Sequence, residues 1–490
     1  MHRKNTIALI ILVFLNVVFF FPLIFQGKVL LEGNLLFSYI PWLTSGEVPH
    51  LPPYNCFASD GLFYFYPFYE FAVNSIKEGI IPLWDPLVGC GIPFYENASF
   101  PFFYPGIALF YVLPFDLAWN VTFILHFILS GLCMYLFLKK LRLSFYASIF
   151  GSIAYNFGGF AFTFLFINEH IYPFFWTPLI FLAIEVFFDK PSLRAAALLG
   201  LLAGFQCLIG QVVFTFYLLL IAGLYFLFRL MLRYIETKDI KITLKSVALV
   251  SVSLIIFILI SSPIIFSYAK LMAATSRGAN TVLFGGLPAF KDILGHFNPV
   301  RLFAGDGNGH PWWLALSVFT PYLFGDCVHQ LYWGSYNYSY DITSASARYW
   351  GIFALIFFVF MLFNLKRGHI KAVFFVVISL ILLAANFKLL NVLVFLPVAG
   401  FLEKYHNRML FMLAFTVPVA AAFGLDLLLK AERPRSSRTA VFIILLLSCM
   451  AGTVCYFYYF KESSVLALVN NWSFKNNIGA LIPNVGNSGC

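Results

Sequence analysis

Asp60 is the acidic residue that the sequence places best for chemistry. It precedes Gly61 and an aromatic, amphipathic segment, residues 62–78, in the long loop after the first apolar run. A charge at membrane level is costly, about 2.5–3.5 kcal/mol at mid-bilayer and less near the interface, so its presence hints at a function. Such a carboxylate can act as a general base toward an acceptor hydroxyl. The alternative is an N-cap on a surface helix, a role that Ser59 could also fill.

Three further ionisable residues offer related chemistry. Glu32 lies in the sequence LLEGNLLFSYIPW, which echoes the surroundings of Asp60, and is either a second acid or a solvated residue. Glu169 and His170 share a tight turn, where an imidazole can serve as acid, base or metal ligand, and where a simple polar turn is an equal alternative. The nine histidines contain no HExxH or comparable ligand pair. No metal site is therefore predicted, and a divalent metal stays open as a cofactor.

Cations and aromatic rings complete the set of candidates. Lys270, Arg277 and Arg408 can bind a lipid phosphate, because a guanidinium matches two of its oxygens, or they can snorkel to lipid headgroups. Three aromatic side chains are candidates for stacking on sugar rings, the alternative being an interfacial aromatic belt. These are Tyr66, Trp84 and Tyr104.

The remaining polar positions have simpler interpretations. Glu185 and Asp426 lie in apolar runs near basic ends, and we interpret them as snorkelling residues. Cys56 and Cys90 share one loop and can pair in an oxidising compartment. Glycosylation motifs of the form N-x-[ST] matter only in a host that uses them. They begin at Asn97, Asn120, Asn337 and Asn471.

The elements that must position these residues are apolar. Of the 490 residues, 61% are hydrophobic and 11% are charged, and the mean hydropathy is +0.88. Soluble chains contain about 25% charged residues. This composition excludes a soluble enzyme, a disordered chain and a disulfide-dense secreted domain, because so much apolar surface needs lipid around it. The sequence predicts an all-α polytopic membrane protein.

About eleven runs, within a range of 10–13, are long enough to cross a bilayer, which takes about 20 apolar residues per helix. They cover 7–25, 119–138, 145–167, 171–188, 193–209, 211–232, 244–265, 349–364, 371–387, 408–429 and 439–460. The segment 104–114 is a half-span or an interfacial helix. The first run is a signal anchor, since no small-residue cleavage site follows it.

The loops between these runs alternate in charge. One set holds 19 Lys and Arg with four acids, and the other holds 12 with 15 acids. The positive-inside rule places the first set in the cytoplasm, the N-terminus inside and the C-terminus outside. The net charge of +10 is then a signal of topology in the plasma (inner) membrane and does not indicate nucleic-acid binding.

The long loops all lie on the outer side in this topology. A single membrane domain, 1–460, carries the first outer loop (26–118) and the second outer loop (266–347), followed by an outer tail, 461–490. No cytoplasmic loop exceeds about a dozen residues, and no Gly-rich phosphate-binding motif occurs. Nucleotide-driven transport is poorly supported, so any chemistry belongs to the outer loops.

The first outer loop resembles the opening signature of the bacterial YfhO-like membrane protein family. That signature has an Asp, a Tyr-Pro pair, Gly-x-x-Pro-Leu-Trp-Asn-Pro, Gly-Gly-x-Pro-Phe and a closing Phe-Tyr-Pro. The matching positions are Asp60, Tyr66-Pro67, Gly79, Pro82-Leu83-Trp84, Pro86, Gly91, Pro93-Phe94, Asn97 and Phe103-Tyr104-Pro105. Asp85 replaces the usual Asn, and Cys90 replaces the first Gly of the pair. Weaker matches, among them His170, Arg277, Tyr349-x-Gly351 and Arg408, extend the resemblance over about residues 28–430.

The resemblance implies an activity, because this family is similar to the group C glycosyltransferases. Those multi-span enzymes use a polyprenyl-phosphate-linked sugar as donor and an acid of the first outer loop as base. The resemblance assigns that role to Asp60, phosphate contacts to Arg277 and Arg408, and a GT-C-like helix bundle to the fold. The acceptor is expected to be an envelope glycopolymer or glycolipid, and membrane lipids are the other partners.

Two other functions stay open. A transporter or flippase for a lipid-linked saccharide would use the same cations and aromatic residues, but it predicts polar residues along a path through the spans. A non-catalytic scaffold would use residues 26–118 as a docking surface. The spans are nearly free of charge, which favours the enzyme over the flippase.

Overall fold

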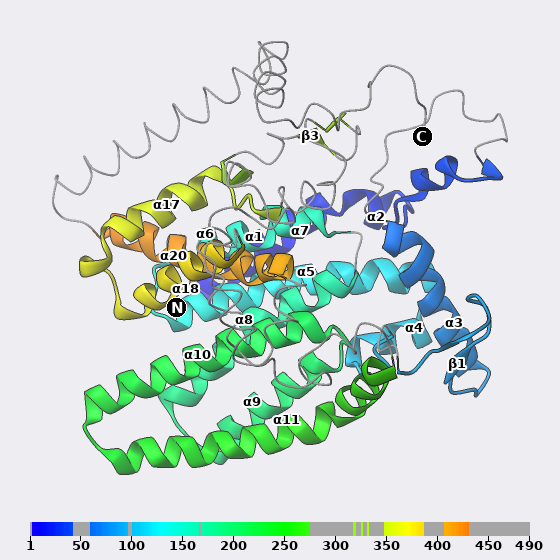
Figure 1. Cartoon of the computed structure of the whole chain (residues 1–490). Helices are drawn as coiled ribbons and strands as arrows, with labels where there is room; N and C mark the ends of the chain where they lie inside the picture. The colour runs from blue at the N-terminus through cyan, green and yellow to red at the C-terminus, as the bar shows by residue number, and fades with distance from the viewer. Residues whose placement is uncertain are drawn as a thin grey trace, which may run out of the picture.

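The computed structural model describes residues 2–42, 59–96, 100–165, 168–274, 317–319, 325–326, 331–332, 347–386 and 406–430. Within these ranges the protein is almost entirely helical (Figure 1). Two short antiparallel hairpins are the exceptions, β1 (Trp84–Asp85) with β2 (Ile92–Pro93), and β3 (Gly325–Asp326) with β4 (Leu331–Tyr332). The expected span 439–460, the tail and the residues Cys56 and Arg277 lie outside the described ranges.

Five described helices are long and apolar enough to cross a membrane. They are α5 (Phe115–Lys140), α8 (Asn168–Asp189), α10 (Val212–Thr237), α11 (Ile240–Ala274) and α20 (Leu410–Leu429). Three shorter apolar helices accompany them, α9 (Leu193–Cys207), α17 (Ile352–Phe363) and α18 (Ile370–Asn386). A 26-residue helix such as α5 is about 39 Å long, which exceeds the ~30 Å hydrocarbon core. The prediction of an all-α membrane protein is confirmed.

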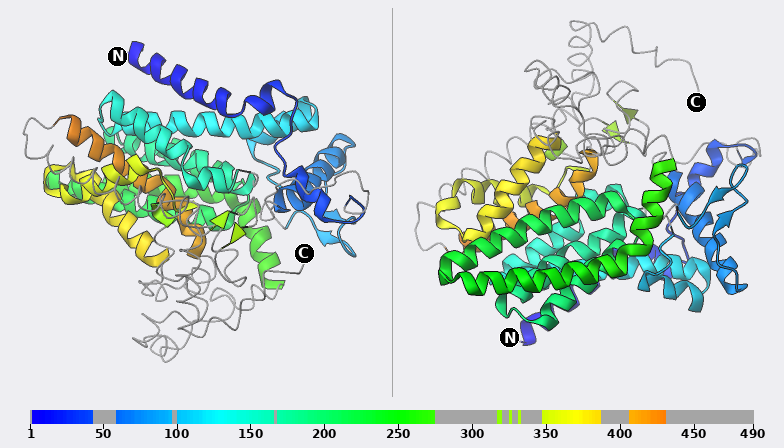
Figure 2. Two further views of the ribbon diagram at one scale, coloured as in Figure 1. Left: turned by 90° about the horizontal axis from the view of Figure 1, so that it is seen from above. Right: turned by 60° about the horizontal axis from the view of Figure 1, so that its bottom comes forward.

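The other described elements are shorter. Before the bundle come α1 (His2–Phe19), α2 (Phe21–Phe25), η1 (Gly33–Ser38), η4 (Gly61–Phe65), α3 (Tyr66–Lys77), η5 (Pro105–Ile107) and α4 (Ala108–Val112). Within it lie α6 (Phe145–Asn156), α7 (Gly159–Thr163), η8 (Leu365–Arg367) and η10 (His406–Met409). Figures 1 and 2 show α3, α4 and β1 gathered at one end of the long helices. The segment 104–114 is therefore no crossing, since α4 has only five residues.

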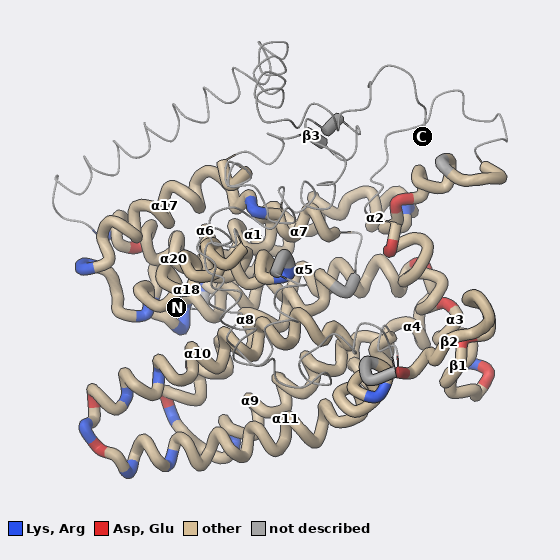
Figure 3. Tube along the Cα trace, viewed as in Figure 1, with Lys and Arg blue, Asp and Glu red and all other residues tan. Residues whose placement is uncertain are grey.

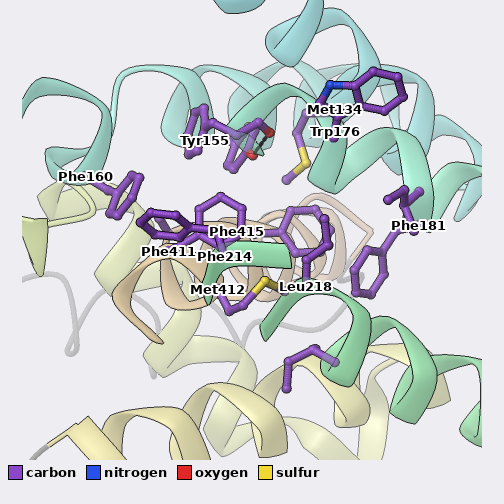
Figure 4. Packing of buried hydrophobic residues seen from close by; sticks show 14 of the residues in the cluster. Met134, Tyr155, Phe160, Trp176, Phe181, Phe214, Leu218, Phe411, Met412 and Phe415 are labelled. Atoms are coloured by element: carbon purple, nitrogen blue, oxygen red, sulfur yellow. Dashed lines mark hydrogen bonds between the residues drawn. The ribbon is translucent and has the colours of Figure 1, made fainter. Parts of the chain in front are cut away.

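Helices α8 and α20 form the centre of the bundle. Of their most apolar stretches 83% and 78% are buried, against 17% for α11, whose outer face is left for lipid. Phe411 and Phe415 of α20 pack among rings from three neighbouring helices (Figure 4). A helix that is apolar all round is stable only when it is buried, which explains why α20 contains no charge until Asp426.

The predicted run 145–167 does not form one continuous helix. Helix α6 ends at Asn156 after 12 residues, about 18 Å, and α7 follows after a break. Asn156 is fully buried, where it accepts a hydrogen bond from Ser130 and donates to Asn16 Oδ1 at 3.2 Å. This polar junction ties α1, α5 and α6 together at the break.

Charge is distributed unevenly along the bundle. Figure 3 shows Lys and Arg gathered where α10 turns into α11, and the same end holds Lys140 and Asp189. We call this end of the bundle the basic end. The described part of residues 26–118, the segment that is expected to be the first outer loop and keeps that name below, lies at the opposite end, where Figure 3 shows several acids.

Candidate functional site

Asp60 lies directly before η4, in a helical turn of the first outer loop. Its backbone is helical, with φ −60° and ψ −37°, and its exposed side chain makes no capping hydrogen bond. The capping interpretation is therefore wrong. The residues that follow, Gly61–Phe65, form a single π-helical turn, a rare geometry that is often found at functional sites.

Helix α3 fixes the position of this turn. One face of α3 is buried against the bundle through Phe68, Tyr69, Ala72 and Val73. At its first residue, the hydroxyl of Tyr66 donates to the Asp116 carboxylate, and the ring contacts Trp119 edge-on at 5.2 Å. Partial burial and the nearby Asp116 carboxylate raise the pKa of Tyr66. Tyr66, expected to stack on a sugar, instead anchors α3 to α5.

Of the three predicted stacking residues, Trp84 is the one whose side chain is largely exposed. It stands on β1 with 54% of its surface exposed. A Cβ built on Gly91 would lie only 2.3 Å from Trp84 Nε1, so the glycine backbone lies directly beside the indole. Next to it, Asp85 is buried, and its Oδ1 accepts the N–H of Leu87 at 2.8 Å. Asp85 thus holds the hairpin turn, while Trp84 remains available to a ligand.

Tyr104 is not available, and the stacking role expected for it is wrong. Its side chain is buried inside the bundle, where the hydroxyl bonds with the His126 ring and accepts the Trp176 N–H at 3.2 Å. Its ring stacks on Tyr172 at a centroid distance of 6.1 Å. Tyr104 therefore inserts the first outer loop between α5 and α8.

His170 and Arg408 meet although 238 residues separate them. The Nη1 of Arg408 contacts Nε2 of His170, and the guanidinium lies 5.5 Å from the centre of the Phe214 ring. His170 also stacks on Phe164 at 4.5 Å. Because a guanidinium only donates, Nε2 must be the acceptor, and the imidazole is neutral with its proton on Nδ1.

The other candidates are distributed more widely. Lys270 Nζ lies 3.9 Å from Glu96 Oε1, an ion pair between the end of α11 and the first outer loop. Glu32 directly precedes η1, and Tyr39 at the other end of η1 packs on Phe63 of the π-helical turn at 5.0 Å. The segment that begins at Glu32 thus runs beside Asp60. The Glu169 side chain and Arg277 are outside the described part of the structure.

The structure therefore contains two centres at the same end. No hydrogen bond or ion pair between described residues joins Asp60 to His170, Lys270 or Arg408. A row of rings connects the two centres along α5: Tyr66 to Trp119 at 5.2 Å, Trp119 to Phe123 at 5.5 Å, and Phe123 to Tyr172 at 5.7 Å. Tyr172 lies two residues after His170.

The interpretation of Glu185 and Asp426 as snorkelling residues is wrong. Glu185 is 1% exposed and binds Arg229 Nε at 2.7 Å, Lys371 Nζ at 2.6 Å and the Tyr225 hydroxyl at 2.6 Å. Asp426 binds Lys430 and accepts the backbone N–H of Ser144 at 2.8 Å. Both carboxylates connect helices at the basic end, which a snorkelling side chain in lipid headgroups would not do.

Sequence reasoning missed Arg348 and Asn120. Arg348 is fully buried, and its Nε donates to Asn386 Oδ1 at 2.9 Å. Its only sequence signal is a cation directly before an apolar run. Asn120, one of the glycosylation motifs, is buried: it accepts the N–H of Leu30 at 2.9 Å and donates to the Lys28 carbonyl at 2.7 Å.

A scan against protein-family models finds no matching family for this chain, and a search of curated proteins finds no match either. Among the described residues, no group of three His, Cys, Asp or Glu side chains is placed to hold a metal ion. The candidate residues therefore offer the exposed Asp60 carboxylate, the exposed Trp84 indole and the contact between the buried His170 imidazole and the partly buried Arg408 guanidinium.

Proposed function

We propose that this protein is a membrane glycosyltransferase, with Asp60 as its general base. It transfers a sugar from a polyprenyl-phosphate-linked donor to a cell-envelope polymer or glycolipid on the outer face of the plasma membrane. The observation that carries the proposal is the Asp60 carboxylate, exposed and unbonded among described residues, directly before a π-helical turn that continues into the packed helix α3. A base must be free to accept a proton and fixed enough to meet the acceptor.

The reaction needs few groups. Asp60 removes the proton of an acceptor hydroxyl while its oxygen attacks the anomeric carbon of the donor sugar. The bond from that carbon to the phosphate oxygen breaks, and the electron pair leaves with the polyprenyl phosphate. Arg408 stabilises the negative charge that develops on that phosphate. Trp84 gives the sugar an apolar face on which to stack.

The topology proposed for this function follows from the charge pattern. About eleven spans form a GT-C-like bundle, with the N-terminus in the cytoplasm and the C-terminus outside. The basic end then faces the cytoplasm, and the first outer loop faces the acceptor. A lipid-linked donor reaches the site within the bilayer, so the chain requires no nucleotide-binding domain.

The decisive variant is Asp60→Asn, measured with reconstituted protein and a radiolabelled polyprenyl-phosphate sugar. Loss of a general base lowers the transfer rate by about 10²–10⁴-fold. Glu70→Gln is the matched control, because Glu70 is an exposed acid on the adjoining helix α3 and its loss should leave the rate unchanged. Transfer at the wild-type rate by Asp60→Asn, at normal protein levels, rejects Asp60 as the base.

The same preparation separates the other functions. Movement of the labelled lipid across the vesicle membrane without product indicates a flippase. A protein that neither forms product nor moves the lipid fits the scaffold.

A further inference from the structure

The turn between α10 and α11 carries several exposed cations close together in sequence. Residues 233–245, which we call the α10–α11 turn, contain Arg233, Lys238, Lys241 and Lys245. The three lysines are exposed, and their side chains form no ion pair with any residue that the structure describes. Like charges three and four residues apart repel each other, so this arrangement is favoured by an anion from outside the chain.

The two acids of the turn do not neutralise these lysines. Asp239 has a local role, because its Oδ1 accepts the backbone N–H of Lys241 at 2.8 Å at the start of α11. Glu236 is exposed and has no ion-pair partner within the described ranges. The α10–α11 turn thus keeps a positive charge, with four cations against two acids.

The lysines lie on one side of the start of α11 and at the tip of the turn. Lys241 and Lys245 are one helical turn apart and therefore share a face of α11. Lys238 ends α10 with a φ of +50°, a conformation in which glycine is the usual residue, and its N–H donates to the Tyr234 carbonyl at 2.7 Å. The tip therefore carries a cation that the closing of the turn does not require.

Exposed apolar side chains lie beside the lysines. Ile240 and Leu244, also one helical turn apart, are 56% and 57% exposed. By helical periodicity, their stripe continues along α11 toward Leu254, Ile255 and Ile258, which are exposed on the face left for lipid. A basic stripe beside an apolar stripe is typical of an element that lies in a membrane interface.

The length of α11 places the lysines at the surface of the bilayer. Residues 246–269 contain no charged side chain. The rise from Lys245 to Lys270 is at most about 38 Å, because any bend at Pro263 can only shorten it. That length exceeds the ~30 Å hydrocarbon core and stays within the ~40–45 Å of the whole bilayer. Lys245 therefore lies among the headgroups of one leaflet when Lys270 lies among those of the other.

Contacts with neighbouring helices hold the turn at this depth. Nη1 of Arg233 donates to the Phe188 carbonyl of α8 at 2.8 Å, which ties the end of α10 to the bundle. Oγ of Ser253 donates to the Ala196 carbonyl of α9 at 2.8 Å, which ties α11 to the bundle above the turn. In Figures 1 and 3 the α10–α11 turn forms one corner of the bundle.

We propose that the α10–α11 turn binds anionic phospholipid headgroups at the bilayer surface. Lys238, Lys241 and Lys245 bind the headgroup phosphates, while Ile240 and Leu244 pack against the first methylene groups of the acyl chains. Cations clustered directly beside a membrane-spanning helix attract acidic lipids in this way. Lipid binding of this kind requires only that the bundle spans a membrane, and it does not depend on the proposed transferase activity.

Native mass spectrometry of the purified protein tests this surface, with phosphatidylglycerol and phosphatidylcholine as probes. The wild-type protein should bind phosphatidylglycerol at least about tenfold more tightly, equivalent to about 1.4 kcal/mol, and a high ammonium acetate concentration should weaken the preference. The triple variant Lys238→Gln/Lys241→Gln/Lys245→Gln should lose most of it. Equal binding of the two lipids by the wild-type protein overturns the proposal and indicates a soluble acidic partner for the same lysines.

A second triple variant distinguishes a site from general electrostatic attraction. Arg142, Lys366 and Arg367 are exposed cations outside the α10–α11 turn: Arg142 follows α5, and the other two lie on η8. Arg142→Gln/Lys366→Gln/Arg367→Gln removes the same formal charge and should keep the preference for phosphatidylglycerol. Equal losses in the two triple variants would show a diffuse effect of net charge and overturn the site.

The apolar part of the surface has its own matched pair of variants. Leu244→Ser should weaken phosphatidylglycerol binding, whereas Leu254→Ser, at a position that is 55% exposed and lies deeper in the bilayer, should not. Both changes affect exposed side chains, so each protein should unfold at the wild-type temperature. Wild-type binding by Leu244→Ser would mean that the lysines act apart from the bilayer surface, which contradicts the proposal.

Discussion

At the scale of single residues, Tyr66 shows how the first outer loop is held. Its phenol donates to Asp116, and its ring packs on Trp119, so the chain just after Asp60 is tied to α5. The bond requires a protonated phenol. Partial burial and the Asp116 carboxylate keep the proton on, because both raise the pKa of Tyr66 above the usual 10.0.

This raised pKa predicts a pH dependence of stability. The contribution of Tyr66 is fully present below pH 10, the pKa of the unfolded phenol, and is lost as the pH rises through the higher pKa of the folded protein. Tyr66→Phe should remove this contribution, at a cost of about 0.5–1.5 kcal/mol at neutral pH. Unfolding in nanodiscs between pH 8 and 11 measures it. Tyr146→Phe, at a residue that is 70% exposed, should behave like wild type.

The residue types in the sequence predicted which side chains can do chemistry better than they predicted which side chains are in contact. The sequence marked His170 and Arg408 as ionisable residues on one side of the membrane, and the structure brings them into contact. It could not reveal that Tyr104 is buried or that Glu185 binds two cations, because those partners lie far away in the chain. Burial depends on packing between helices, which hydropathy along one segment does not encode.

At the scale of elements, α9 and α11 show what small residues do in a membrane bundle. Gly200 and Gly204 share one face of α9, and a Cβ on them would lie 2.5 Å from Ser253 O and 2.8 Å from Ile260 Cβ. Without a hydrophobic driving force between helices in lipid, close backbone approach is a main source of their attraction. α11 depends on this contact, since little else buries it.

Gly204→Leu should therefore loosen α11 from the bundle. Overpacking of this kind costs about 1–3 kcal/mol, and the unfolding temperature of the purified protein should fall. Gly223→Leu on α10 is the matched control, because nothing lies within 4 Å of a Cβ at that position. Equal unfolding temperatures for the two variants would contradict the role assigned to the α9–α11 contact.

Helix ends were predicted correctly where charged residues or Pro stand at the end of an apolar run. They were missed where contacts with side chains of other helices determine the end. The ends of α5 and α8 near Lys140 and Asp189 agree with the charge pattern. The break after Asn156 was missed because the residues that follow are mainly Phe, Gly and Ala, so the apolar run continues through the break. The stop coincides with a buried polar junction to Ser130 and Asn16, which only the assembled bundle reveals.

At the scale of the whole molecule, the Glu185 cluster joins three helices at the basic end. Glu185 comes from α8, Tyr225 and Arg229 from α10, and Lys371 from α18. The Glu185 carboxylate faces Arg229 with one oxygen and Lys371 with the other, so both cations depend on a single acid. Removing it would leave Arg229 and Lys371 largely buried without their shared partner.

Glu185→Gln should destabilise the protein by about 3–5 kcal/mol, as expected when one partner of a buried ion pair is removed. Thermal unfolding of purified protein measures the loss. Asp189→Asn is the control: its pair with Lys140 is exposed, and such pairs contribute at most about 1 kcal/mol. A Glu185→Gln protein that unfolds with the control would show that the cluster does not hold the helices together.

The buried Asn120 has a consequence for the order of assembly. Asn120 binds the backbone at Lys28 and Leu30, which is synthesised about ninety residues earlier. These backbone groups therefore have no Asn120 partner until α5 has left the ribosome. In a host that glycosylates N-x-[ST] motifs, an oligosaccharide transferred during that interval would block the contact permanently. In such a host, the binding of residues 28–30 to Asn120 competes with glycosylation of Asn120. Expression in a bacterial host that does not glycosylate these motifs removes the competition.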